Sequence, residues 1–77
     1  MEKVSQTKVL DNYQLEVIFN DGVKGIISLS ARLFGPVFEP LKDPAFFAQA
    51  KIDEFGVITW PNGADLAPDA LYERLKH

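Results

Sequence analysis

Apolar and polar residues alternate along two neighbouring stretches near the start of the chain. Apolar or small side chains occupy every second position from Tyr13 to Phe19 and again from Val23 to Leu29. Alternation with a period of two is typical of half-buried strands. The polar segment Asn20-Asp21-Gly22 between the two stretches suits a tight turn. We therefore expect a β-hairpin here.

The length of the hairpin loop decides which side chains share a face of the sheet. A two-residue turn at Asp21-Gly22 would pair Phe19 with Lys24, so that an apolar row would lie opposite a polar one. A three-residue loop with Gly22 in the left-handed conformation pairs Phe19 with Val23 instead. This register places all the large apolar groups on one face, and we predict it for that reason.

Two isoleucines, Ile18 and Ile26, fall on the opposite face in this register. Either another part of the chain covers them, with residues 34–41 as the candidate, or they are available to a partner protein. The sequence leaves both alternatives open. Ile18 and Ile26 are therefore candidate interaction residues.

The segments on either side of this hairpin carry weaker signals. Residues 4–10 predict a strand, and their polar content favours the edge of a sheet. Ser30 suits the cap of one short helical turn, which Gly35-Pro36 would end. Residues 37–41 are apolar without a clear period, so we expect an irregular segment that crosses the core.

The second half of the chain predicts two helices and another hairpin. Asp43 before Pro44 favours a helix over residues 44–50, with one of two phenylalanines turned inward. A three-residue loop at 54–56 would close a hairpin that pairs Ile52 with Ile58. Pro68 suits the first position of a C-terminal helix.

These elements together indicate one domain over residues 1–77 with an α+β fold. We expect an antiparallel sheet of about five strands, formed by the two hairpins and an edge strand. A short middle helix and the C-terminal helix would pack on one face of it.

The composition, 47% hydrophobic and 25% charged with a net charge of −3, is that of an ordinary globular domain. Its eight Lys and Arg residues are scattered, which argues against nucleic-acid binding. No apolar run approaches the ~20 residues that span a bilayer, and the first residues do not lead into a signal peptide. We expect a cytoplasmic protein without membrane association.

A chain of 77 residues without cysteine has a small core and no disulfides. Small domains often gain stability from a second subunit. We therefore expect a homodimer or a complex with another small protein.

Few residues are candidates for chemistry. The only histidine is the terminal His77, so Ser28 and Ser30 have no base to activate them. No calcium-binding or phosphate-binding loop is present. We expect neither an enzyme nor a bound metal or cofactor.

The best candidate for a ligand site is the turn before the last helix. Trp60, Asn62, Asp65 and Tyr72 would line it, with the indole as a stacking wall. In the alternative, Trp60 packs in the core, Asn62 shapes the turn, and Asp65 bonds backbone amides at the helix start, as Asp69 serves the helix dipole. We favour the alternative, because aromatic residues beside turns are usually packed.

The segment from Trp60 to Tyr72, WPNGADLAPDALY, resembles the C-terminal signature of a small bacterial family, domain of unknown function 2442. Residues 13–22, residues 36–41 and the Phe46-Phe47 pair resemble the same family, so that the likeness covers almost the whole chain. The family often has an acidic residue where this chain has Ser28, and a role of that carboxylate does not carry over. The resemblance implies a compact α+β domain without an established activity.

Some members of the family append a helix-turn-helix domain, and we do not expect one in this sequence. Some are encoded beside another small protein, in an arrangement similar to toxin–antitoxin pairs. The first hypothesis is therefore a non-enzymatic interaction or regulatory module, an antitoxin-like partner of another small protein. The alternative is a small-ligand-binding or enzymatic domain that uses the turn from Trp60 to Asp65.

Overall fold

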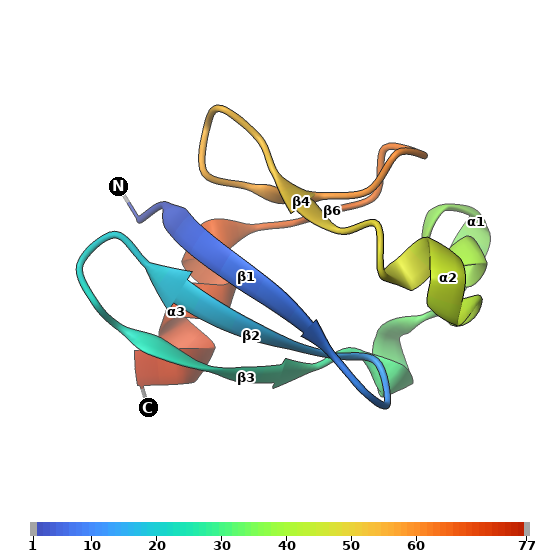
Figure 1. Ribbon diagram of the computed structural model, residues 1–77, viewed down its shortest axis with the longest axis horizontal. Helices are drawn as coiled ribbons and strands as arrows, with labels where there is room; N and C mark the ends of the chain where they lie inside the picture. The colour runs from blue at the N-terminus through green and yellow to red at the C-terminus, as the bar shows by residue number, and fades with distance from the viewer. Residues whose placement is uncertain (1, 77) are drawn as a thin grey trace.

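A computed structural model describes residues 2–76, so that the expectation for His77 lies outside the described part. Three antiparallel strands in the order β1-β2-β3 form sheet A: β1 (Val4–Leu10), β2 (Gln14–Phe19) and β3 (Lys24–Ser28). Three shorter antiparallel strands in the order β4-β5-β6 form sheet B: β4 (Lys51–Ile52), β5 (Ile58–Thr59) and β6 (Asp65–Leu66). Figure 1 shows sheet B lying beyond β1.

The α+β class is confirmed, but the single sheet of about five strands is wrong. The two sheets meet where the Val4 N–H donates to the Gly56 carbonyl at 2.9 Å. Beyond this point the register of β1 shifts between Val4 and Gln6. An irregularity of this kind bends a strand, and β1 and β4 do not continue as one ladder. The sixth strand, β6, has no counterpart among the predicted elements.

The β2–β3 hairpin has the predicted three-residue loop. Leu15 pairs with Ile27, and the Phe19 N–H donates to the Val23 carbonyl at 2.8 Å. Gly22 has a φ of 94°, the left-handed conformation that this loop requires. The predicted register is therefore confirmed. The second predicted hairpin, β4–β5, likewise pairs its two isoleucines around a three-residue loop.

Helical segments gather at the two ends of the sheets (Figure 1). One end carries four short turns: η1 (Ser30–Arg32), α1 (Gly35–Phe38), η2 (Glu39–Lys42) and α2 (Pro44–Phe47). The other end carries α3 (Pro68–Lys76), which packs against β3. A Cβ at Gly25 would lie 2.5 Å from Leu75 Cδ2, so that glycine is what permits this close approach.

Three local predictions in this helical part need correction. Residues 37–41 are helical rather than irregular. Pro36 and Pro40 stand at the second positions of α1 and η2, within the first turn, where the missing N–H of proline breaks no helical bond. The helix α2 is capped by Asp43 as predicted but ends at Phe47, since the next turns tighten into bonds of the i→i−3 type. Ser30 caps no helix, and its hydroxyl lies 3.4 Å from that of Ser28.

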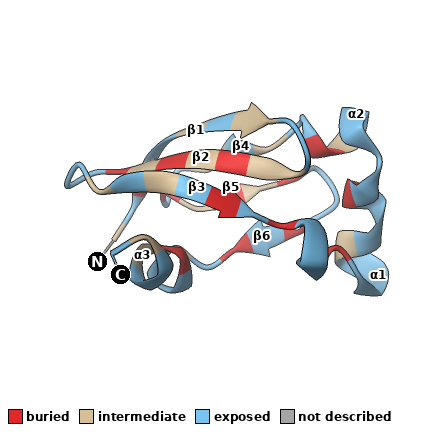
Figure 2. Cartoon of the chain, turned by 90° about the horizontal axis from the view of Figure 1, so that it is seen from below, coloured by how far each residue is buried: buried red, intermediate tan, exposed pale blue. Residues whose placement is uncertain are grey.

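The core lies between the two sheets and is drawn in red in Figure 2. Its buried residues come from both sheets, the short helical turns, α3 and the turn after β5. They are Val4, Leu15, Val17, Phe19, Ile27, Leu29, Leu33, Leu41, Phe47, Ile58, Trp60, Ala64, Leu66 and Leu71. Every second residue of β2 belongs to this set, as its alternating pattern requires.

Candidate functional site

Trp60 lies in the core with only 2% of its surface exposed. Its indole N–H donates to the Phe47 carbonyl at 2.9 Å, and the two rings lie 5.8 Å apart at a tilt of 35°. A buried indole whose N–H already has a hydrogen-bond partner has neither a free donor nor an exposed ring face for a ligand. Trp60 therefore joins the end of β5 to α2 and does not form the wall of a pocket.

Asn62 holds the turn that follows Trp60. Its side-chain carbonyl accepts from the Ala64 N–H at 3.1 Å, and its amide donates to the Val37 carbonyl at 2.8 Å. The first bond shapes the turn and the second ties it to α1. Both polar groups of the Asn62 side chain are therefore engaged within the fold.

Asp65 lies in β6, opposite Thr59 of β5, and its side chain is exposed. The helix α3 begins only at Pro68, where the Leu71 N–H bonds the Ala67 carbonyl at 3.2 Å. The expectation that Asp65 bonds backbone amides at the helix start is therefore wrong. The turn after Trp60 returns the chain onto β5, and this pairing overrides the local signal for a helix cap.

We predict that Asp65→Ala changes the free energy of unfolding by no more than about 0.5 kcal/mol, as for an exposed residue without a structural contact. Asp43→Ala is the matched control. Its carboxylate accepts from the Ala45 N–H at 3.0 Å as a true cap, so its loss is expected to cost about 1 kcal/mol. Urea unfolding of both variants measures the difference. Equal losses would show that Asp65 supports the helix after all.

Tyr72 connects α3 with the β2–β3 loop. Its hydroxyl donates to the Asp21 carboxylate, and its ring lies edge-on to Phe19, with centroids 5.0 Å apart. The Asp21 carboxylate also accepts from the Val23 N–H at 3.0 Å. These two bonds lower the pKa of Asp21, and the bond to Asp21 raises the pKa of Tyr72. Tyr72 thus has a structural partner far from Trp60.

The Asp21–Tyr72 contact predicts a pH dependence. A carboxylate whose folded pKa lies below its ordinary 3.8 stabilises the fold above that pH, and the contribution is lost as the pH falls through the folded pKa. Tyr72→Phe should therefore raise the pKa of Asp21, measured by NMR titration of its carboxyl carbon. The variant should be less stable than the parent at about pH 6, and this difference should shrink as the pH falls through the folded pKa of Asp21. A pH-independent difference would contradict this assignment.

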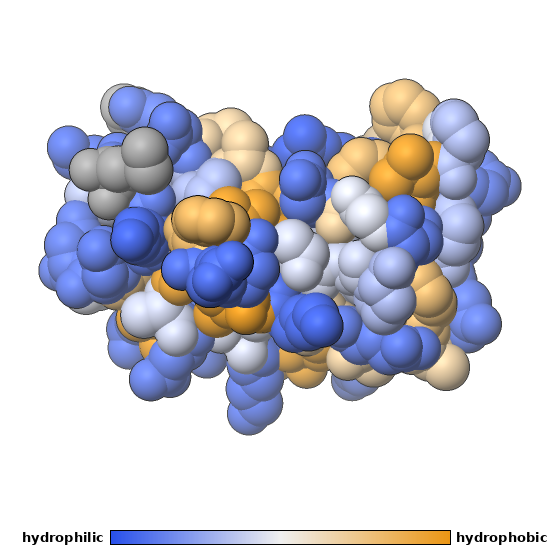
Figure 3. All heavy atoms as spheres, turned by 90° about the horizontal axis from the view of Figure 1, so that it is seen from above, coloured by the Kyte–Doolittle hydropathy of each residue, from blue (hydrophilic) through white to orange (hydrophobic). Residues whose placement is uncertain are grey.

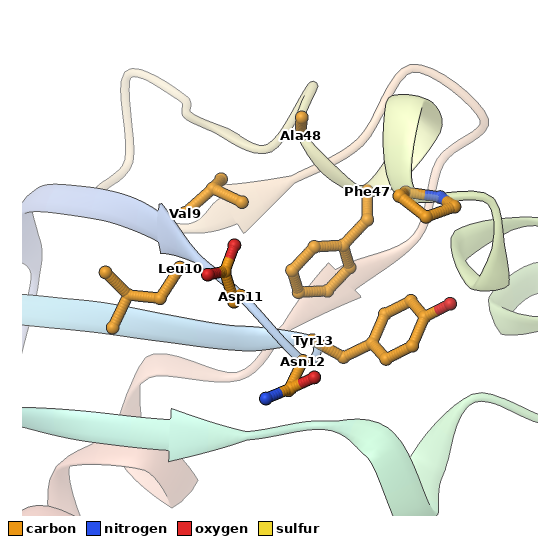
Figure 4. Close-up of a pocket in the computed structure, with 8 residues that line it drawn as sticks. Val9, Leu10, Asp11, Asn12, Tyr13, Phe47 and Ala48 are labelled. Carbon is orange, nitrogen blue, oxygen red and sulfur yellow. The ribbon is translucent and has the colours of Figure 1, made fainter.

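The four residues predicted around the last turn are therefore not brought together into one pocket. An open groove of about 630 Å³ lies elsewhere, between the β1–β2 turn and α2. Its lining is mainly apolar and comprises Val9, Leu10, Asp11, Asn12, Tyr13, Pro44, Phe47 and Ala48. In Figure 4 the Asp11 carboxylate lies between the side chains of Val9 and Phe47.

Tyr13, which lines the groove, has an unusual backbone conformation. Its φ is 59°, next to Asn12 at 60°, and the left-handed region is unfavourable for a residue with a Cβ. The Tyr13 hydroxyl donates to the Lys42 carbonyl, and its ring lies edge-on to Phe47 at 5.5 Å. These contacts hold the strained residue in place. The alternation along β2 gave no signal of this conformation.

The outer face of sheet A, which points away from the core, contains Ile18 and Ile26. We use this name for the outward-facing side chains Gln6, Lys8, Leu10, Gln14, Glu16, Ile18, Lys24, Ile26 and Ser28. None of them is fully buried, and 56% of the Ile26 surface is exposed. Ile18 is half-buried beside a shallow hollow of about 110 Å³.

Residues 34–41 do not cover this face, because they form α1 and η2 at one end of the molecule (Figure 1). Of the two alternatives left open by the sequence, burial under this segment is therefore wrong. The opposite side of the molecule, which Figure 3 shows from above, carries its apolar groups in separate small patches among hydrophilic ones.

The backbone of β3 adds a second feature at Ile26. The Phe19 N–H donates to the Val23 carbonyl at one end of β3, and the Leu29 N–H donates to the Tyr13 carbonyl at 2.9 Å at the other end. The odd-numbered residues of β3 therefore form their backbone hydrogen bonds with β2. In an antiparallel pair the residues between them direct their N–H and C=O groups to the other side. These residues are Lys24, Ile26 and Ser28. Since β3 is the last strand of sheet A, their backbone groups point to an open edge.

Residues 2–76 contain neither a cluster of metal-ligating side chains nor a membrane-spanning helix. No group of three or more His, Cys, Asp or Glu side chains in this range is arranged to hold a metal ion. Nor does this part of the chain contain a helix of the length and apolar character that crossing a membrane requires.

Fold and surface together define a small α+β domain of two antiparallel sheets, with one uncovered sheet face and one open strand edge. The chain matches the model of the protein family of unknown function DUF2442 over residues 4–77. It therefore belongs to this family, and the resemblance seen in the sequence is confirmed. No curated protein and no solved structure matches the chain.

Proposed function

We propose that this chain is a non-enzymatic protein-interaction module, a regulatory partner of another small protein in the manner of an antitoxin. The partner binds the outer face of sheet A. Binding covers Ile18 and Ile26, and the polar side chains around them form the rim of the interface.

The observation that carries this proposal is the exposure of Ile26 in the middle of a strand. β-Branched residues in strands normally pack against neighbours, and a sheet usually covers at least its apolar positions. Ile26 is 56% exposed and stands beside the half-buried Ile18. Two neighbouring apolar residues in a polar surround are the usual composition of a small contact site.

Within residues 2–76, three of the four candidate side chains around the last turn are engaged in the fold, which supports a non-enzymatic role. Trp60, Asn62 and Tyr72 make their polar contacts within the fold. The two groups whose pKa values shift, Asp21 and Tyr72, bond each other at an exposed loop. Shifted pKa values at a functional site usually accompany a cleft, and this pair lines none of the hollows described above.

The test is size-exclusion chromatography with light scattering, on the chain alone and with the product of the gene encoded beside it. We expect a complex with the neighbouring protein. Ile26→Lys should weaken that complex at least about tenfold, because it places a charge in the buried centre of the contact. A chain that remains monomeric and ignores its neighbour would contradict the proposal.

Phe55→Lys is the matched control for Ile26→Lys. Phe55 is 66% exposed, in the β4–β5 loop of sheet B, so the substitution makes the same chemical change away from the outer face. It should leave the complex intact. If both variants weaken binding equally, the outer face of sheet A is not the contact surface.

Small-ligand binding is the second candidate function, and the groove beside Tyr13 supports it. A hollow of about 630 Å³ is large enough for a drug-sized ligand, and backbone strain tends to occur at binding sites. A ligand screen read by thermal shift tests it. Ala48→Trp, which fills the groove from an exposed position, should abolish any shift, whereas Asp65→Asn should preserve it. The reverse result would return the site to the last turn.

A further inference from the structure

Besides its outer face, sheet A has an open edge at β3 that another strand can join. We propose that β3 pairs antiparallel with β3 of a second copy of this chain, around a two-fold axis at Ile26, and joins the two copies of sheet A into one six-stranded sheet. This inference rests on the proposed function, because it uses the same surface and names a second copy as the occupant of its edge.

A row of unpaired backbone groups runs along the outer edge of β3. Three residues, Lys24, Ile26 and Ser28, direct N–H and C=O groups away from β2. An open edge of this kind is a template for an added strand. Figure 2 views the molecule from the side of this edge, and no segment is drawn across β3. In this view the helix α3 lies below the first part of β3, where Leu75 meets Gly25.

The sequence of β3 also suits two-fold pairing of the strand with a copy of itself. Ile26 is the central residue of Lys24–Ser28, so a two-fold axis at Ile26 pairs the whole strand with its copy. Lys24 then lies opposite Ser28 of the second copy, and no like charges face each other. An axis at Lys24 would oppose two lysines, and an axis at Ser28 would leave half of the strand unpaired. The register centred on Ile26 is therefore favoured.

The charges beyond the strand ends are also complementary. The same register carries the residues after β3 toward the β2–β3 loop of the second copy. Arg32, an exposed cation in η1, is thus directed toward the side of the second copy that bears Asp21. Opposite charges at both ends of a contact favour one orientation of it.

Pairing of the two edges would widen the outer face. Ile18 is opposite Lys24 on β2 and therefore diagonal to Ile26. In the paired arrangement the two Ile26 side chains are adjacent, and the Ile18 side chains flank them. The result is a cluster of four isoleucines on the four central strands, bordered by Glu16 and Lys24, and this cluster serves as the docking site of the proposed partner. A dimer thus prepares the surface on which the second protein binds.

A single-cysteine experiment tests the register directly, because the native chain has no cysteine. In Ile26→Cys the two Cα atoms across the axis would be about 5.5 Å apart, as in any hydrogen-bonded antiparallel pair, which suits a disulfide. Lys24→Cys is the register control, since its two sulfurs would be offset by four residues, or about 13 Å. Phe55→Cys reports random collision, because Phe55 is 66% exposed in the β4–β5 loop and does not belong to the β3 edge.

We expect Ile26→Cys to form a disulfide-linked dimer at least about tenfold faster than either control under mild oxidation, since pairing raises the local thiol concentration. Light scattering of the unmodified chain from about 10 µM to about 1 mM should show a rise toward the dimer mass, because a five-residue edge is a weak interface. Equal oxidation of the three variants, or a constant monomer mass, would overturn the inference.

The two proposals fail separately. If the chain stays monomeric but still binds the neighbouring protein through Ile26, only the β3 pairing is wrong. If the Ile26→Cys dimer forms and the neighbouring protein is ignored, the partner assigned under the proposed function is wrong and the pairing stands. A faster disulfide in Lys24→Cys than in Ile26→Cys would place the axis at Lys24 and overturn the register.

Discussion

Replacing Trp60 with alanine is expected to lower the free energy of unfolding by about 3–5 kcal/mol, the range for removing a large aromatic side chain from a core. The indole is 98% buried, packs against Phe47, and donates its N–H to the carbonyl of that residue. It is also the residue at which β5 gives way to the turn that leads to β6. For a domain of this size the loss is a large part of the total stability, so much of the variant should be unfolded at 37 °C.

Trp60→Phe separates the two contributions of the indole. The variant keeps an aromatic ring in the core but removes the indole bond to the Phe47 carbonyl. That carbonyl still accepts from the Ala50 N–H at 3.2 Å, so the lost bond should cost only about 0.5–1.5 kcal/mol. Urea unfolding followed by circular dichroism measures both variants. A loss below about 1 kcal/mol for Trp60→Ala would contradict a core role and would return Trp60 to the candidate ligand residues.

The second large effect is expected at Gly56, in the loop between β4 and β5. Gly56 has a φ of 77°, and a Cβ there would lie 2.5 Å from the Lys3 Cβ and 3.0 Å from the Lys3 Cα. Gly56→Ala therefore combines left-handed strain with a collision against backbone, and we expect a loss of about 2–4 kcal/mol. Relieving this collision would also displace the Gly56 carbonyl, which accepts the hydrogen bond from the Val4 N–H where the two sheets meet.

Gly63→Ala is the matched control for this prediction. Gly63 has a similar φ of 93°, but no atom lies within 4 Å of the position of its Cβ. Only the conformational cost of about 1–2 kcal/mol should remain. Thermal or urea unfolding of the two variants gives the difference between them. Equal losses would mean that the contact between Lys3 and Gly56 does not hold the sheets together.

The hairpins could be predicted from the sequence because their signals are local. Alternating side chains fixed the faces of β2 and β3, and a glycine with positive φ at Gly22 and at Gly56 fixed the loop lengths. The strand β6 could not be predicted in this way. It has only two residues, and its pairing depends on the turn after Trp60 bringing Leu66 back to Ile58.

Two aspartates show the same limit. Asp43 and Asp65 both precede a proline-initiated helix, Asp43 directly and Asp65 by three positions. Asp43 caps its helix, whereas Asp65 pairs in a strand. The difference comes from the long-range ladder with β5, which a local motif does not contain.

For the outer face of sheet A, the sequence predicted which residues point outward but not whether they are exposed. The register that turned Ile18 and Ile26 away from the core followed from the length of the β2–β3 loop. Their exposure depended on the path of residues 34–41. This segment forms two short helices, each with a proline in its first turn, at the end of the sheets. The groove at Tyr13 was missed because a tyrosine with positive φ is held by tertiary contacts to Lys42 and Phe47.

The central claim is that the β3 edge of sheet A is a protein-contact surface, and residue-resolved hydrogen exchange by NMR tests it most directly. The amides of Gly25 and Ile27 bond to β2 and should be protected at every concentration. We predict that the amides of Lys24, Ile26 and Ser28 exchange freely in dilute solution and become protected on concentration, as a second copy of the chain pairs with this edge. If these three amides exchange at the same unprotected rate under all conditions, the edge has no partner and the claim is wrong.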